Sequence, residues 1–201
     1  MNIKEHFQRL YKTYGNSPQS VHWADFKTQV KRFEVLLGVD KNIESLIDVG
    51  CGLGDMYQYL QAQGFNGRYC GTDFVDEFID SANQKFNSPN VVFKLSDIKN
   101  DALPLGYDYA VLSGVFNNKT DENKDFMINT IHKMFSACKK GVAFNAMSTY
   151  VDYRDEILYY SNPMEIFDYC KRNLTRNVIL RHEYLVKENS IPYEYTMYLY
   201  K

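Results

Sequence analysis

Hydrophobic positions change their spacing along this chain. Between Phe7 and Tyr14 they recur at helical intervals, and a Gly-Asn-Ser-Pro run at 15–18 ends that pattern. A second helical pattern covers Asp25 to Leu37 and ends at Gly38. Both patterns lie before the first apolar run typical of a strand, so they predict two helices added in front of the core.

From residue 45 onward, short apolar runs alternate with helical patterns. The runs predict strands at 45–49, 68–72, 91–95, 107–112 and 141–146. The patterns between them predict helices at 55–63, 75–86 and 120–137, and Asn162-Pro163 is typical of the start of one more. Two β-rich runs, 177–187 and 193–201, end the sequence, and their short connection suits an antiparallel hairpin.

This alternation predicts an α/β fold, in which a mostly parallel sheet has helices on both faces. Because ligands of such sheets bind beyond the carboxyl ends of the strands, the residues that follow each strand are the candidate site. No long linker and no internal repeat divides the chain. We therefore expect one domain over 1–201, with residues 1–40 as a helical addition and 41–201 as the core.

Composition narrows the function classes. Of the 201 residues 45% are hydrophobic, and 23 Lys and Arg stand against 25 Asp and Glu, so we expect a globular protein without a nucleic-acid partner. No apolar run is long enough for a membrane span and no signal peptide is visible, so we expect a cytoplasmic location. The four cysteines form no C-x-x-C pair, which predicts reduced thiols and no metal site.

The strongest chemical signal is Asp48-Val49-Gly50-Cys51-Gly52-Leu53-Gly54, directly after the first predicted strand. Three glycines in five residues allow a sharp turn and a close approach of the backbone to a ligand. The helix that follows directs its free N–H groups into the same space. Asp73 ends the second strand, where a carboxylate can bind ribose hydroxyls, and Asp97 follows the third, where one can bind an adenine amino group.

With these residues, the sequence from about 45 to 201 resembles the class I S-adenosylmethionine-dependent methyltransferases. The resemblance implies a Rossmann-like sheet of seven strands, with a C-terminal antiparallel hairpin and S-adenosylmethionine as cofactor. It places Gly50, Cys51, Gly52 and Gly54 beside the methionine and ribose moieties, and Asp73 with Phe74 at the ribose. It places Ser96, Asp97 and Ile98 around the adenine, and Ser113, Gly114 and Val115 beside the transferring methyl group.

Two other interpretations remain. A nicotinamide or flavin domain would also use Asp73, but it requires G-x-G-x-x-G and lacks the closing hairpin. A methyltransferase-like subunit without activity of its own, which binds the cofactor or activates a partner, stays open.

The N-terminal helices are expected to form a lid over the site, because 1–37 are too few residues for an independent core. Tyr14 and Trp23 would present aromatic faces to the cofactor's sulfonium, and Arg32 would pair with its carboxylate. A packing role for Trp23 and an exposed position for Arg32 are the alternatives. His22 is a weak candidate for a catalytic base, with a surface or packing role as the alternative.

The methyl acceptor is expected to be a small molecule or a biosynthetic precursor methylated on oxygen or nitrogen. The chain has Ser113-Gly114-Val115-Phe116 where amino-methylating enzymes of nucleic acids often carry Asn-Pro-Pro-aromatic. Asn117, Asn145 and Tyr150 are candidate acceptor-binding residues. The alternative roles are a chain turn for Asn117, a strand cap for Asn145 and packing on the sheet for Tyr150.

Overall fold

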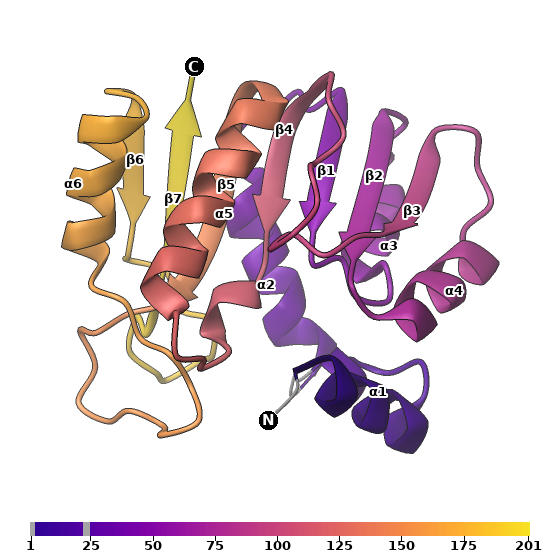
Figure 1. The fold of residues 1–201 in the computed structure, drawn as a ribbon, viewed down its shortest axis with the longest axis horizontal. Coiled ribbons are helices and arrows are strands. Elements are labelled where there is room, and N and C mark those ends of the chain that lie inside the picture. Colours follow the sequence, from indigo (N-terminus) through magenta and orange to yellow (C-terminus); the bar gives the residue numbers. More distant parts are fainter. Residues whose placement is uncertain (1–2, 22–24) are drawn as a thin grey trace.

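The computed structural model describes residues 3–21 and 25–201. In this part of the chain one sheet of seven strands has the order β3-β2-β1-β4-β5-β7-β6 (Figure 1). The strands are β1 (Ser45–Val49), β2 (Arg68–Asp73), β3 (Val91–Leu95), β4 (Tyr107–Leu112), β5 (Cys138–Met147), β6 (Val178–Arg181) and β7 (Glu194–Tyr200). The helices are α1 (Ile3–Tyr14), α2 (Phe26–Leu37), α3 (Asp55–Ala62), α4 (Asp76–Lys85), α5 (Asn123–Ala137) and α6 (Pro163–Asn173), with short 3-10 turns η1 (Pro18–Val21) and η2 (Val115–Asn117).

The first five strands run parallel, so their carboxyl ends meet at one edge of the sheet. Val49 is level with Thr72 of β2 and with Leu112 of β4, which brings the segments that follow these strands side by side. β7 lies antiparallel between β5 and β6. The α/β class, the mostly parallel sheet and the antiparallel end predicted from sequence are confirmed.

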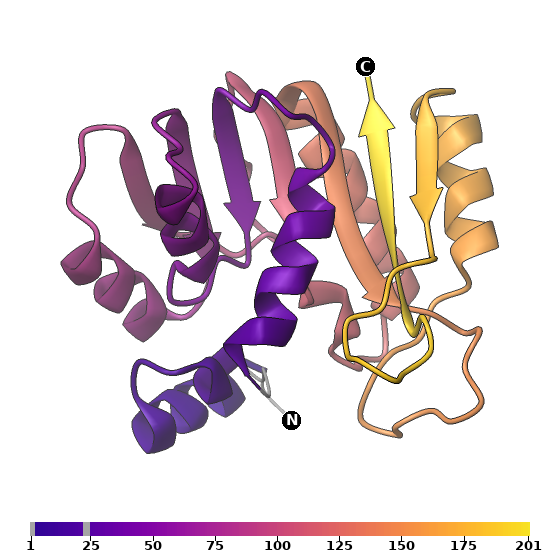
Figure 2. The ribbon, with the colours of Figure 1, turned by 180° about the vertical axis from the view of Figure 1, so that it is seen from behind.

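Each face of the sheet is covered by its own helices. On one face, α2, α3 and α4 bury residues such as Leu36, Leu60 and Ala82 against the strands. On the other, α5 and α6 bury residues such as Ile131 and Ile166. Figure 1 looks onto the face covered by α5 and α6. Figure 2 views the molecule from behind, where α2 lies in front of the sheet. The sheet is therefore the middle of three layers.

Two helices begin at side-chain caps, of which the one at Asn162 was predicted from the sequence. The Asp25 carboxylate accepts a hydrogen bond from the Thr28 N–H at 2.7 Å, and the Asn162 side chain accepts one from Met164 N at 2.9 Å. Pro163 takes the first helical position, where its missing N–H costs nothing. Local side-chain chemistry thus fixes where α2 and α6 begin.

Two predicted strand boundaries were wrong by three residues or more. The β6–β7 pairing stops at Arg181 opposite Thr196, so residues 182–187 leave the sheet and the connection is longer than expected. The reason is that Tyr184 and Val186 are buried against Val35 of α2, which explains their alternating apolar pattern without a strand. β5 begins at Cys138 rather than at 141, because α5 continues into it without a loop.

The two N-terminal helices are held differently. α2 is tied to β7, since the hydroxyls of Tyr198 and Tyr200 donate hydrogen bonds to the carbonyls of Val35 and Val39. α1 lies beyond the carboxyl ends of the strands and contacts α4 (Figure 1). α2 is therefore part of the core layer, and α1 with η1 forms a separate cover.

All four cysteines lie in the described residues, buried and unpaired. Within those residues no helix is both long and apolar enough to cross a membrane. The same residues hold no group of three His, Cys, Asp or Glu side chains placed to bind a metal ion.

Candidate cofactor site

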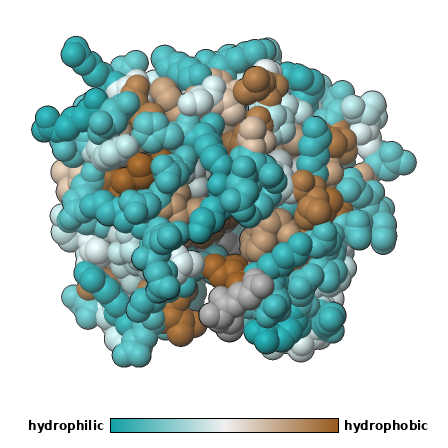
Figure 3. Space-filling view, in the orientation of Figure 1, coloured by the Kyte–Doolittle hydropathy of each residue, from teal (hydrophilic) through white to brown (hydrophobic). Residues whose placement is uncertain are grey.

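A cavity of about 930 Å³ opens at the carboxyl ends of the parallel strands. Its walls come from the segments after β1, β2, β3 and β4, and from α1, η1, α2 and the start of β7. Figure 3 shows the molecule hollowed near the middle of the face seen in Figure 1, beside hydrophobic side chains. The position is the one expected for the ligand of a parallel sheet.

The glycine loop after β1 forms one wall of this cavity. Gly50 and Gly52 both line it and have φ values of +74° and +53°, where side chains are strained. A Cβ on Gly50 would stand 2.2 Å from a methyl of Val115, and one on Gly52 would stand 2.9 Å from a methyl of Val21. The two glycines thus allow η1 and η2 to pack closely against the loop that follows β1.

Asp73, at the end of β2, holds the glycine loop in place. Its carboxylate accepts hydrogen bonds from the N–H groups of Gly52 at 2.9 Å and Val75 at 3.0 Å. Burial raises the pKa of this carboxyl to about 6, although the backbone N–H groups of Val75 and Gly52 act in the opposite direction. Asp73 is therefore a cavity-lining carboxylate with unused lone pairs and a perturbed pKa.

Asp48, the acidic residue that precedes the loop, is also buried and lines the cavity. Its carboxylate accepts a hydrogen bond from the hydroxyl of Tyr69. Burial raises the pKa of Asp48 to about 7, and the nearby carboxylates of Asp73 and Asp55 raise it further, against the Tyr69 hydrogen bond. Several acidic groups therefore face one cavity.

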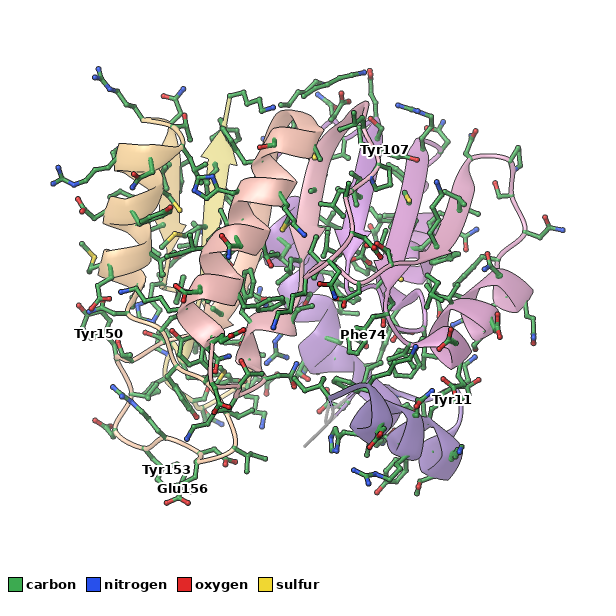
Figure 4. The ribbon with its side chains drawn as sticks, in the orientation of Figure 1. Tyr11, Phe74, Tyr107, Tyr150, Tyr153 and Glu156 are labelled. Carbon is green, nitrogen blue, oxygen red and sulfur yellow. The ribbon has the colours of Figure 1, made fainter. Side chains whose placement is uncertain are left out.

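The structure brings most of the predicted cofactor residues together around this cavity. Phe74 lines it, and Figure 4 shows this side chain between α1 and the strand ends. The other predicted residues that line it are Arg32, Gly50, Cys51, Gly52, Asp73, Ser96, Asp97, Ile98, Ser113, Gly114 and Val115. Asn117, predicted at the acceptor, lines it as well, and its side-chain oxygen accepts a hydrogen bond from Met147 N at 3.1 Å.

Two predicted residues lie on the surface instead. Tyr14 ends α1 with 52% of its surface exposed, and Tyr150 is 56% exposed and packs against His182. Neither lines the cavity, and Figure 4 shows Tyr150 at the left edge of the molecule, away from Phe74 near the middle. The predicted His22 and Trp23 lie outside the described residues.

Two more predicted residues lie behind the cavity wall. A side chain at Gly54 would point into the core, where its Cβ would stand 2.8 Å from the Phe86 ring. Asn145 is buried and holds other wall residues in place, since its side-chain oxygen accepts from Gly114 N at 2.8 Å and its amide donates to Glu194 at 3.3 Å. Both support the cavity without lining it.

Arg32 lines the cavity but is engaged within the protein. Its guanidinium donates hydrogen bonds to the Glu194 carboxylate from Nε, at 2.9 and 3.0 Å, and from Nη2. Arg32 is 5% exposed and Glu194 is 1% exposed, so the pair is buried. The expected pairing of Arg32 with a cofactor carboxylate is therefore replaced by a contact between α2 and β7.

Among the polar cavity residues that the sequence did not indicate are Gln29, Asp55 and Glu194. Gln29 of α2 donates a hydrogen bond from Nε2 to the Asp55 carboxylate at 3.0 Å. Gln29 and Arg32 are three positions apart and so share one face of a helix, a signal that was present in the sequence. Nothing local marked Glu194, because its partner lies 162 positions away.

Comparison with known proteins agrees with this geometry. A family model described as a methyltransferase domain matches residues 47–141. Rv1506c of Mycobacterium tuberculosis, which is classed as a methyltransferase, is 33% identical over 156 residues that cover 73% of this chain and 90% of the relative. The chain belongs to the class I S-adenosylmethionine-dependent methyltransferase family.

More distant relatives of this methyltransferase include named enzymes. Malonyl-[acyl-carrier protein] O-methyltransferase 1 of Ilyobacter polytropus is 26% identical over 161 residues, which cover 77% of this chain and 56% of the relative. The chain thus spans about half the length of that enzyme.

Solved structures share the fold of this methyltransferase. Magnesium protoporphyrin IX methyltransferase from Synechocystis superposes with a TM-score of 0.65 at 15% identity, covering 98% of this chain and 91% of the other. The plantazolicin methyltransferase superposes with a TM-score of 0.65 at 16% identity, covering 100% and 91%. At this identity the likeness shows the fold alone.

Proposed function

We propose that this methyltransferase binds S-adenosylmethionine in the cavity and transfers its methyl group to an oxygen or nitrogen of a small-molecule acceptor. The observation that carries the proposal is the glycine loop held by Asp73 at the end of β2. The relative named malonyl-[acyl-carrier protein] O-methyltransferase supports an acceptor outside nucleic acid.

The residues present fit this cofactor. Gly50 and Gly52 line the cavity, and because neither has a side chain, Val115 and Val21 pack directly against the glycine loop. The hydroxyl of Ser113, on the wall after β4, is buried without a hydrogen-bond partner among the described residues, so a bound ligand can satisfy it. Asp73 presents a carboxylate that can accept hydrogen bonds from ribose hydroxyls.

Bound S-adenosylmethionine supplies an electrophilic methyl carbon on a sulfonium. The protein's task is then to hold the acceptor atom in line with that carbon and to exclude water. The wall after β4 and the side chains of Asn117 and Glu194 border this part of the cavity. Their hydrogen-bonding groups suit the orientation of a polar acceptor.

Calorimetry with S-adenosylhomocysteine, followed by methyl transfer from labelled cofactor to metabolite extracts, tests the proposal. We expect the purified protein to bind S-adenosylhomocysteine and to label a small-molecule fraction. Preference for NADH would favour the dinucleotide interpretation. Binding without labelling of any fraction would favour a non-catalytic, partner-activating subunit.

We further propose that α1 and η1 act as the lid, within a single domain. α1 docks on α4 through aromatic contacts, in which the Phe7 ring lies edge-on to Phe74 at 6.4 Å and to Phe78 at 6.1 Å. A salt bridge of 2.6 Å between Lys4 and Asp76 lies beside them. Since Phe7 and Val21 both line the cavity, this cover closes its outer side.

Removing the Phe7 ring should loosen the lid. Phe7→Ala deletes aromatic contacts worth about 0.5–1.5 kcal/mol each, so we expect faster amide exchange in residues 3–21 and weaker binding of S-adenosylhomocysteine. In the wild type, ligand should slow exchange in the same segment. Lys12→Ala, at an exposed position of α1, is the control. Equal exchange with and without ligand would contradict a lid.

Cofactor binding should depend on pH through Asp73. In the empty cavity the pKa of Asp73 is about 6, so the carboxyl is mostly protonated at pH 5 and ionised at pH 8. Ribose hydroxyls that donate hydrogen bonds to the carboxylate favour its ionised form, so binding at pH 5 requires the loss of a proton. We expect S-adenosylhomocysteine to bind about tenfold more weakly at pH 5 than at pH 8 on this account. Asp73→Asn cannot ionise, so it should bind weakly at both values. An unchanged pH profile in that variant would assign the dependence to another group.

A further inference from the structure

A buried polar atom on α2 has no partner. Gln29 is 3% exposed and lines the cavity, and its side-chain oxygen Oε1 accepts no hydrogen bond from the described residues. The amide is oriented by Asp55, whose carboxylate accepts a hydrogen bond from Nε2 at 3.0 Å. An unsatisfied buried carbonyl is costly, and here a ligand that carries an N–H or O–H group would satisfy it.

The charges around Gln29 indicate what kind of donor fits. Asp48 and Asp55 are buried acidic residues that line the cavity with Gln29, and the Asp55 carboxylate is close enough to raise the pKa of Asp48. The nearest cation on α2, Arg32, is bound to Glu194. This corner of the cavity is therefore rich in hydrogen-bond acceptors and negative charge. It favours an ammonium group and repels a carboxylate.

We propose that Gln29, oriented by Asp55, binds the α-ammonium group at the methionine end of the cofactor. This inference rests on the proposed function and assigns a specific contact within it. α2 lies outside residues 47–141 matched by the family model, so the contact belongs to this chain's N-terminal segment. It also reverses the expected chemistry of α2, from a cation that binds the cofactor's carboxylate to a carbonyl that binds its ammonium.

Three probes separate the parts of the cofactor. S-adenosylhomocysteine carries both ammonium and carboxylate, 5′-(3-aminopropyl)thioadenosine keeps the amine alone, and 5′-methylthioadenosine has neither. Calorimetry on the purified chain should show that Gln29→Leu weakens the first two by about tenfold or more, as expected for a hydrogen bond to a charged group, and leaves the third unchanged. Gln29→Met, of similar length and without hydrogen-bonding groups, should behave in the same way.

The third probe also reports whether the variants fold, since it needs an intact adenosine site. Gln61→Leu, on the exposed side of α3, is the matched control and should bind all three probes like the wild type. If the Gln29 variants bind S-adenosylhomocysteine more weakly but bind 5′-(3-aminopropyl)thioadenosine like the wild type, Gln29 contacts the carboxylate, and the inference is overturned. Unchanged affinity of the Gln29 variants for all three probes would overturn it as well. The side-chain oxygen of Gln29 would then be available to an amine of the methyl acceptor. Failure of the wild type to bind any probe would instead refute the proposed function.

Discussion

Gly52→Val is expected to abolish cofactor binding, with a loss in affinity for S-adenosylhomocysteine of roughly a hundredfold or more. The new side chain would grow from a residue at φ +53° toward Val21, whose methyl would lie 2.9 Å from the added Cβ. Since Gly52 and Val21 both line the cavity, either one would have to shift and so change the cavity wall. The measurement is calorimetric titration with S-adenosylhomocysteine.

Gly64→Val separates this effect from backbone strain. Gly64 has a φ of +79°, and a Cβ there meets nothing within 4 Å. Both substitutions place a branched residue in the left-handed region, at a cost of about 1–2 kcal/mol each. Only Gly52→Val should lose the ligand, because Gly64 does not line the cavity. Equal loss in both variants would mean that global destabilisation, and not a change in the cavity wall, explains the result.

The strands were predictable because each is a short apolar run between turn residues. Their parallel orientation follows from the helices that connect them. β1, β3 and β4 have the predicted boundaries. The segment 182–187 was not predictable in the same way. Its alternation of apolar and polar residues is that of a strand, but Tyr184 and Val186 are buried against α2, a tertiary contact that local spacing does not encode.

The same distinction applies to the site. Gly52 and Asp73 were predictable because the residues at and after the carboxyl ends of the strands form the ligand edge of a parallel sheet, and the structure joins them by a hydrogen bond of 2.9 Å. The cofactor role of Arg32 was predicted from its residue type, and the sequence did not reveal that its partner in the fold is Glu194. Tyr150 was interpreted from its position after β5, but the loop carries it outward into solvent. Pairings between distant segments decide which polar side chains remain available to a ligand.

Breaking the buried pair between Arg32 and Glu194 is expected to destabilise the fold strongly. Arg32→Leu leaves the Glu194 carboxylate buried with only the weaker contact from Asn145, so the free energy of unfolding should fall by about 3–5 kcal/mol. The double variant Arg32→Leu/Glu194→Leu removes both charges and should recover most of that loss. Urea denaturation followed by circular dichroism measures these differences.

An exposed pair on α6 provides the comparison. The side chains of Arg172 and Asp168 are 73% and 60% exposed and form an ion pair of 2.7 Å, so Arg172→Leu should change the free energy of unfolding by about 1 kcal/mol or less. A small effect of Arg32→Leu on unfolding, combined with lost affinity for S-adenosylhomocysteine but not for 5′-methylthioadenosine, would restore Arg32 as a cofactor ligand. A large effect that the double variant reverses would establish α2 as a fixed part of the core, so that any closing motion is confined to α1 and η1.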